Sequence, residues 1–138
     1  MIKYMLDTNM IAYAKNRRPA VVLERLMQHD PSEICISSIT MAELEYGVHN
    51  SSKPEQNRTA LMMFLSGITI LPFDSDASFE YGKIRYALKS KGILIGGNDL
   101  LIAAHAKSLG LTLATHNTRE FSRVEGLSIE DCAYKIPQ

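Results

Sequence analysis

Short apolar runs that alternate with helical patterns are the feature that most constrains the fold of this chain. The runs lie at residues 2–6, 34–37, 68–71 and 111–115, and residues 127–129 have the same character. Runs of this length without a polar face are typical of strands buried on both sides of a parallel sheet. Strands that alternate with helices predict βαβ units joined by right-handed crossovers.

The helical patterns lie between these runs and have clear start signals. Pro19 opens the first, with an apolar stripe that continues to Leu26, and Pro54 introduces another. The predicted helices cover residues 19–26, 39–48, 55–65, 76–91 and 99–109. No repeat or linker divides the 138 residues, so the sequence predicts a single α/β domain over residues 1–138.

Composition excludes several classes of protein. Fifteen basic and fifteen acidic residues cancel, which argues against a nonspecific nucleic-acid coat but leaves room for a nuclease with a local basic rim. The two cysteines have no metal-ligand spacing, and Cys35 lies in an apolar run as a small buried residue. No stretch has membrane-spanning length and no signal pattern opens the chain, so we expect a soluble cytoplasmic protein without a membrane partner.

An aspartate follows the first apolar run directly. Asp7 comes directly after the sequence Ile-Lys-Tyr-Met-Leu and is followed by Thr8 and Asn9. Ligand sites in open α/β sheets lie beyond the carboxyl ends of the strands. Asp7 is also a favourable helix N-cap, and taken by itself the cap is the more common role.

Two further acids have the same ambiguity. Glu43 lies about one turn into the helix that follows the 34–37 run, and Thr40 precedes it at the spacing of a capping box. Asp99 follows Gly96, Gly97 and Asn98 at the start of a nearly all-apolar helix, which Asn98 or Asp99 would cap.

A fourth polar segment follows the 111–115 run. It contains Asn117 and Glu120 within the sequence Thr-His-Asn-Thr-Arg-Glu-Phe, and so offers a hydroxyl, an amide and a carboxylate. Parallel strands end at the same edge of a sheet, so all four positions are expected to lie together there.

Electrostatics determines what must accompany such a cluster. Two carboxylates 4 Å apart repel by roughly 4 kcal/mol at an effective dielectric near 20. A helix N-terminus returns only about 0.3–1 kcal/mol. A divalent cation, a proton or an inserted arginine is therefore required. Oxygen ligands favour Mg²⁺ or Mn²⁺ over zinc, and such ions serve phosphodiester hydrolysis.

These motifs resemble those of PIN-domain proteins, most closely the VapC-type toxins of toxin–antitoxin pairs. The matching segments are residues 6–9, 41–44, 96–99 and 115–121, in the family's order. The resemblance implies a PIN-like three-layer α/β/α sandwich with a mainly parallel sheet. It also implies a Mg²⁺- or Mn²⁺-dependent endoribonuclease that forms a homodimer, is inhibited by a VapB-type antitoxin and cuts a tRNA anticodon stem-loop.

By the same resemblance, Asp7, Glu43 and Asp99 are the metal-binding acids. The fourth family position, often Asp, falls on Asn117, and either Asn117 or Glu120 completes the site. The alternatives are a Rossmann-like phosphatase and a binding module whose acids receive a partner's arginine. The phosphatase is disfavoured because Asn9 stands where its second aspartate belongs.

Other polar residues carry weaker expectations. The basic segment 15–18 is a candidate RNA contact, whereas the lysines and arginine of residues 83–91 are expected to form a solvated helix face. His105 is expected to be a hydrogen-bonded core histidine, and His116 an ordinary loop residue. Tyr46 and Phe79 are expected in the core or a dimer contact.

Overall fold

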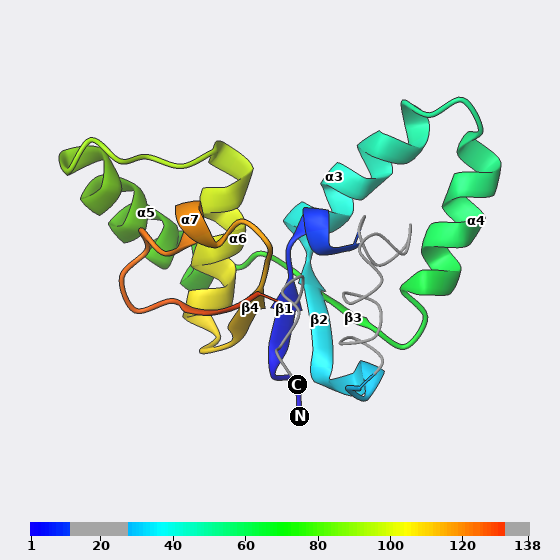
Figure 1. Ribbon diagram of the computed structural model, residues 1–138, viewed down its shortest axis with the longest axis horizontal. Helices are drawn as coiled ribbons and strands as arrows, with labels where there is room; N and C mark the ends of the chain where they lie inside the picture. Colours follow the sequence, from blue (N-terminus) through cyan, green and yellow to red (C-terminus); the bar gives the residue numbers. More distant parts are fainter. Residues whose placement is uncertain (12–27, 132–138) are drawn as a thin grey trace, which may run out of the picture.

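A five-stranded parallel sheet forms the centre of the molecule (Figure 1). The computed structural model describes residues 1–11 and 28–131. Its strands are β1 (Tyr4–Leu6), β2 (Ile34–Ser37), β3 (Thr69–Leu71), β4 (Thr112–Ala114) and β5 (Ser128–Glu130), in the spatial order β3-β2-β1-β4-β5. All neighbouring strands are parallel, which confirms the predicted sheet, including its short final strand.

The register of the three middle strands positions the candidate site. Leu6 of β1 is aligned with Ile36 of β2 and with Ala114 of β4. The residues that follow these three are Asp7, Ser37 and Thr115. They therefore stand next to one another at the carboxyl edge of the sheet, as the apolar runs predicted.

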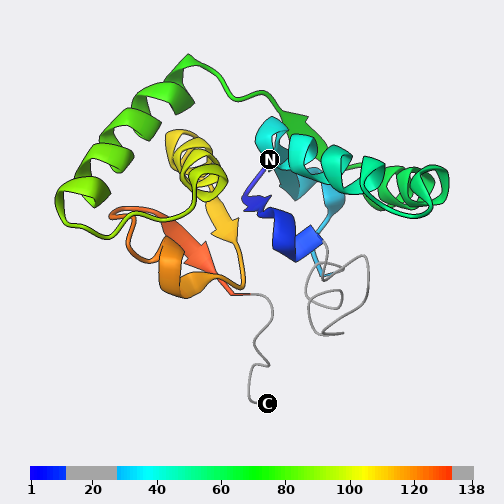
Figure 2. The same ribbon diagram turned by 90° about the horizontal axis from the view of Figure 1, so that it is seen from above.

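Helices cover both faces of the sheet. They are α3 (Ser38–His49), α4 (Pro54–Phe64), α5 (Ser75–Ser90), α6 (Gly97–Ser108) and α7 (Thr118–Phe121), and a 3₁₀ turn, η1 (Pro31–Glu33), precedes β2. Figures 1 and 2 show α3 and α4 on one side, and α5, α6 and α7 on the other. This is the predicted three-layer α/β/α sandwich, and the helix boundaries differ from the predicted ones by one or two residues.

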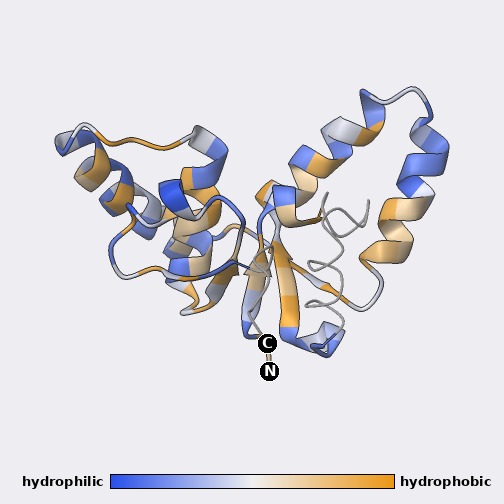
Figure 3. Ribbon diagram, in the orientation of Figure 1, coloured by the Kyte–Doolittle hydropathy of each residue, from blue (hydrophilic) through white to orange (hydrophobic). Residues whose placement is uncertain are grey.

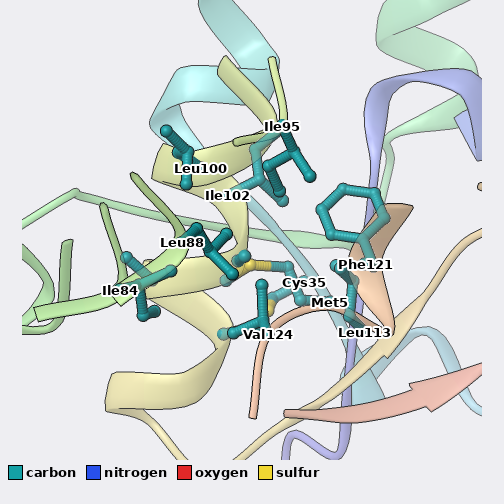
Figure 4. Close-up of a cluster of buried hydrophobic side chains, with 13 residues drawn as sticks. Met5, Cys35, Ile84, Leu88, Ile95, Leu100, Ile102, Leu113, Phe121 and Val124 are labelled. Carbon is teal, nitrogen blue, oxygen red and sulfur yellow. The ribbon is translucent and has the colours of Figure 1, made fainter. Parts of the chain in front are cut away.

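Alternation along the strands supplies a core to each face. Met5, Cys35 and Leu113 point into the cluster beneath α5 and α6, which also contains Ile102 and Phe121 (Figure 4). Their strand neighbours Leu6, Ile36 and Ala114 point into a second cluster beneath α3 and α4. Because both faces are covered, the central strands β1 and β2 have mainly apolar residues on both sides. The exposed turn between α3 and α4 is hydrophilic (Figure 3).

Several predictions concern residues outside the described part. The helix expected at residues 19–26 and the basic segment 15–18 both lie there, so they stay predictions. None of the helices in the described part is long and apolar enough to cross a bilayer.

Candidate active site

Asp7 is the best-held acid at the carboxyl edge. Its side chain is 2% exposed, and both of its carboxylate oxygens accept hydrogen bonds. The Met10 amide donates to Oδ1 at 2.8 Å, so Asp7 does cap the helical turn that begins at Thr8. The Thr115 hydroxyl donates to Oδ2 at 2.6 Å from the end of the neighbouring strand. Burial raises the pKa of Asp7, and these two hydrogen bonds partly oppose it.

Thr115 joins Asp7 to the loop that carries the fourth motif. Its hydroxyl oxygen accepts a hydrogen bond from the Asn117 backbone amide at 2.9 Å while it donates to Asp7. The side chain is fully buried. One hydroxyl therefore fixes both the orientation of the aspartate and the path of the chain into α7.

Glu43 is bound to the Asp7 segment, not to the start of its own helix. The Thr8 hydroxyl donates to Glu43 Oε1 at 2.6 Å. The alternative role of Glu43, in a capping box with Thr40, is absent, because Ser37 is the N-cap and its hydroxyl accepts from the Ile39 amide. The helix begins directly at the end of β2, which leaves the Glu43 carboxylate available to the shared edge.

Asp99 lies in the first turn of α6 and does not cap it. Gly96 is the N-cap residue, with no side-chain cap, and a Cβ placed there would lie 3.5 Å from Asp99 Oδ2. The predicted capping role of Asn98 or Asp99 is therefore absent. Burial raises the pKa of Asp99 to about 6, with contributions from the negative charges of Asp7, Glu120 and Glu43.

The hydrogen bond from Thr8 to Glu43, and a groove that Thr8, Glu43 and Asn98 line together, place the three motifs at one edge. They come from the end of β1, from α3 and from the start of α6, and Glu120 on the short helix α7 joins them. Asn117 is the N-cap residue of α7, although its side chain makes no capping hydrogen bond. Glu120 is close enough to Asp99 for its negative charge to contribute to the raised pKa of Asp99. Asn117 is held at the same edge by the hydrogen bond from its backbone amide to the Thr115 hydroxyl.

An open groove of about 600 Å³ has Glu43 in its lining. Thr8, Glu43 and Asn98 contribute its polar lining, and Ile39 and Leu101 contribute apolar surface. Tyr46 also lines the groove and is 70% exposed, so it does not belong to the core, and the alternative of a dimer contact stays a prediction. Phe79, at 74% exposed, likewise lies outside the core.

The donor set fits a hard divalent cation in its chemistry. The four converging side chains are carboxylates, and their mutual repulsion is what such an ion would offset. Within residues 1–11 and 28–131, no three His, Cys, Asp or Glu side chains are arranged closely enough to hold an ion as they stand. Asp7 and Glu43 instead direct carboxylate oxygens at protein hydroxyls.

The two histidines near this region have different roles. His105 is 1% exposed, and its Nδ1 lies 2.8 Å from the Ser37 hydroxyl, which confirms a hydrogen-bonded core histidine. Because Ser37 caps α3, this contact links α6 to the helix that carries Glu43. His116 is exposed on the loop, with Nδ1 3.3 Å from Asp131 Oδ1.

Sequence reasoning missed the hydroxyls that hold two of the acids. Thr8 and Thr115 were read only as members of their motifs, yet each donates at 2.6 Å to a carboxylate. The available signal was a threonine directly after a strand end or directly after a strand-end aspartate. In both cases the hydroxyl lies at the edge where the acids gather.

Comparison with known proteins agrees with this architecture. The family model described as PIN domain matches residues 4–127. Ribonuclease VapC2 of Haemophilus influenzae is 47% identical over 131 residues, which cover 95% of this chain and 98% of that protein. The tRNA(fMet)-specific endonuclease VapC of Shigella flexneri is 44% identical over the same coverage, 95% and 98%.

Solved structures are similar over the same length. The DNA-bound VapBC of Salmonella typhimurium contains a chain with a TM-score of 0.90 and 42% identity, covering 96% of this chain and 99% of that one. The VapBC2 of Rickettsia felis, bound to a promoter DNA fragment, gives a TM-score of 0.86 and 44% identity, covering 94% and 98%. By fold, motif order and sequence identity, the chain belongs to the PIN-domain family and, within it, to the VapC proteins.

Proposed function

We propose that the protein is a Mg²⁺- or Mn²⁺-dependent endoribonuclease and the toxin of a toxin–antitoxin pair. The observation that carries this proposal is the meeting of Asp7, Glu43 and Asp99 from three separate segments at one edge of a parallel sheet, with the pKa of Asp99 raised to about 6. The names of the relatives, ribonuclease and tRNA-specific endonuclease, support the same activity.

The acids would divide the binding of the ion between them. Asp7 and Asp99 would bind it directly, Glu43 directly or through water, and either Asn117 or Glu120 would complete the site. When bound, Mg²⁺ or Mn²⁺ supplies an activated water and neutralises charge on the phosphodiester during in-line attack.

The protein's own contribution is orientation. The Met10 amide and the Thr115 hydroxyl hold both oxygens of Asp7, so that carboxylate has one direction before substrate arrives. Thr8 does the same for one oxygen of Glu43. The groove lined by Thr8 and Asn98 would receive the RNA backbone, and the exposed ring of Tyr46 beside Glu43 is free to stack on a base.

The activity is tested with purified protein and labelled RNA. We expect cleavage in Mg²⁺ or Mn²⁺, loss of cleavage in excess EDTA, and a loss of more than about 100-fold in Asp7→Asn, since even outer-shell changes at metal sites cost 10–100-fold. Glu55→Gln, which removes an exposed carboxylate from α4, is the matched control and should keep full activity. Equal cleavage with and without EDTA would overturn the proposal.

We propose a tRNA anticodon stem-loop as the substrate and the cytoplasm as the place of action. The support is the tRNA(fMet)-specific endonuclease among the relatives at 44% identity. Incubating total tRNA with the protein and mapping the new ends should give one or a few isoacceptors cut in the anticodon region. Cuts distributed over messenger and ribosomal RNA would contradict this substrate.

The proposed partner is a VapB-type antitoxin, with the toxin as a homodimer. Chains similar to this one occur in VapBC complexes. An antitoxin arginine inserted at the acidic edge would offset the same repulsion that the metal offsets. Coexpression with the neighbouring antitoxin should abolish cleavage, and replacing the inserted arginine by glutamine should restore it. Analytical ultracentrifugation of the toxin tests the dimer.

A further inference from the structure

A second hollow lies among α5, α6 and the segment after α7, and it shares no lining residue with the groove beside Glu43. Its volume is about 170 Å³. Ile84, Leu88 and Val124 form its apolar floor, and all three belong to the hydrophobic cluster beneath α5 and α6 (Figure 4). The floor is therefore part of the packed core and gives the hollow a fixed base.

Four cationic side chains surround this floor. They come from three segments that are distant in sequence, and they are Lys83, Lys91, Lys107 and Arg123. Glu125 is the one acid among the lining residues of this hollow. The whole chain has no net charge, so four of its fifteen basic residues around one small hollow are a strong local excess. We call this hollow the basic pocket.

Two of the cations are held in place. Arg123 Nη1 donates to the Leu94 carbonyl at 3.2 Å. Lys107 Nζ lies 3.5 Å from Glu80 Oε2, and its Cε lies 3.3 Å from where a Cβ on Gly126 would stand. Gly126 has a φ of 81°, so the turn both requires glycine and leaves space for the lysine stem.

Neither the lining acid Glu125 nor the neighbouring Glu80 neutralises the pocket, because two acids face four cations. Glu80 contacts Lys107 through one oxygen and Lys83 through the other, at 3.5 and 3.4 Å. One carboxylate thus faces two ammonium groups. Lys91 and Arg123 remain in addition, so the pocket keeps an excess of positive charge.

The basic pocket adjoins the catalytic edge through α7. The Arg123 amide donates to the Glu120 carbonyl at 3.1 Å, so Arg123 lies one turn beyond Glu120, one of the two residues proposed to complete the site.

We propose that the basic pocket binds a phosphate of the RNA backbone outside the scissile bond. This inference rests on the proposed nuclease function and extends its substrate path. The pocket is smaller than the roughly 300–1,000 Å³ typical of small-molecule sites and has room for about five or six waters at ~30 Å³ each, which suits a phosphate better than a nucleoside. Arginine and lysine are the usual phosphate ligands, and such contacts position the RNA without reading its sequence.

The test measures RNA binding as a function of salt. Two double variants are compared, one inside the pocket and one outside it, and both also carry Asp99→Asn. They are studied in EDTA, so that the RNA is not cleaved. Binding of a labelled tRNA anticodon stem-loop is followed by fluorescence anisotropy. For Lys107→Gln with Arg123→Gln we expect roughly tenfold weaker binding, and a plot of log K against log salt whose slope is smaller by about 0.7, the value for one lost phosphate contact. Lys53→Gln with Lys89→Gln removes the same charge from two exposed residues outside the pocket and should leave the slope unchanged.

Other outcomes separate the competing explanations. Equal slopes for the two double variants would overturn the proposal, as would weaker binding of antitoxin with an unchanged RNA slope, because the pocket would then serve a protein partner. A response of the Arg123 side-chain NMR signal to inorganic phosphate with an unchanged RNA slope would mark a small-anion site and also overturn it.

Two further measurements keep the result interpretable. If the first double variant melts well below the control, Lys83→Gln with Lys91→Gln, both exposed on or just after α5, carries the same expectation. Cleavage by the otherwise unchanged protein in Mg²⁺ is measured in parallel. If the pocket variant has a reduced salt slope but the protein without substitutions does not cleave RNA, the nuclease proposal is refuted and the phosphate site is supported. If that protein cleaves RNA but the two double variants have equal slopes, the phosphate site is refuted and the nuclease proposal is supported.

Discussion

Asp7 and Asp99 are two acids of the same edge that are held in opposite ways. Asp7 is buried, and both of its oxygens accept hydrogen bonds from the Met10 amide and the Thr115 hydroxyl. Asp99 is half-buried, and no donor in residues 1–11 and 28–131 hydrogen-bonds to its carboxylate. Burial raises the pKa of both, but only Asp7 has protein groups that oppose the rise.

The difference separates two ways of building an acidic site. A carboxylate whose two oxygens both accept hydrogen bonds keeps its direction, and those bonds offset part of the cost of burying its charge. A carboxylate that faces only other acids makes the empty site unstable, and its charge is stabilised when a cation arrives. We therefore expect Asp7 to be the fixed reference point of the proposed site, and Asp99 to provide most of its dependence on the ion.

Removing a hydrogen bond to Asp7 is expected to have the largest effect on the difference between Asp7 and Asp99. Thr115→Val keeps the shape of the side chain but leaves Asp7 Oδ2 and the Asn117 amide without their partner. A buried group left unpaired costs about 1–3 kcal/mol, so we expect that loss in the free energy of unfolding measured with urea.

Thr8→Val is the matched control for this change. It removes an equally short hydrogen bond, of 2.6 Å, to Glu43. Because Glu43 is only partly buried, water can replace the hydroxyl, and we expect a loss below about 1 kcal/mol. Equal losses in the two variants would show that Asp7 is no better held than Glu43.

The rise in melting temperature on adding a metal ion tests the role of Asp99. At a concentration ten times its Kd, an ion that binds only the folded state adds about 1.4 kcal/mol, or a rise in melting temperature on the order of 5 °C. We expect Mn²⁺ to raise the melting temperature of the unchanged protein by this amount and to have little effect on Asp99→Asn.

Glu55→Gln provides the control for this metal response, because it removes an exposed carboxylate of α4 and should keep the full rise. An equal rise in Asp99→Asn would mean that Asp99 takes no part in binding the ion. Isothermal titration with Mn²⁺ gives the same comparison as a change in affinity.

The sequence predicted the sheet and its acidic edge because both depend on local patterns. Each apolar run is complete within about five residues, and the polar residue that ends it is its direct neighbour, as with Leu6 and Asp7. A parallel sheet then brings the strand ends to one edge whatever the details of packing.

What the sequence did not predict depends on pairs that are distant along the chain. Thr8 and Glu43 are 35 residues apart and Thr115 and Asp7 are 108 apart, so no periodicity reports their hydrogen bonds. The alternative capping box at Thr40 is absent because its spacing is local, whereas the actual helix start depends on where β2 ends at Ser37.

The smallest effect is the pH dependence that Asp99 gives to the metal-free protein. The pKa of Asp99 is about 6 in the folded chain, against an ordinary value of 3.8, so between these values the folded state binds more protons than the unfolded state. The contribution of Asp99 to stability therefore falls as pH rises from about 4 to 6, and above 6 the ionised carboxylate is fully destabilising. Asp99→Asn removes this loss.

We accordingly expect Asp99→Asn to be more stable than the unchanged protein at pH 7 in EDTA and equally stable near pH 4. One pKa unit corresponds to about 1.4 kcal/mol, but Asp99 is partly exposed and solvent screening reduces the gain to on the order of 1 kcal/mol. Urea denaturation of both proteins across this pH range measures the difference and cancels the titration of groups that do not interact with Asp99. A constant difference at every pH would attribute the effect to helix propensity at the start of α6, and a lower stability of the variant at pH 7 would mean that Asp99 is held by the fold as firmly as Asp7.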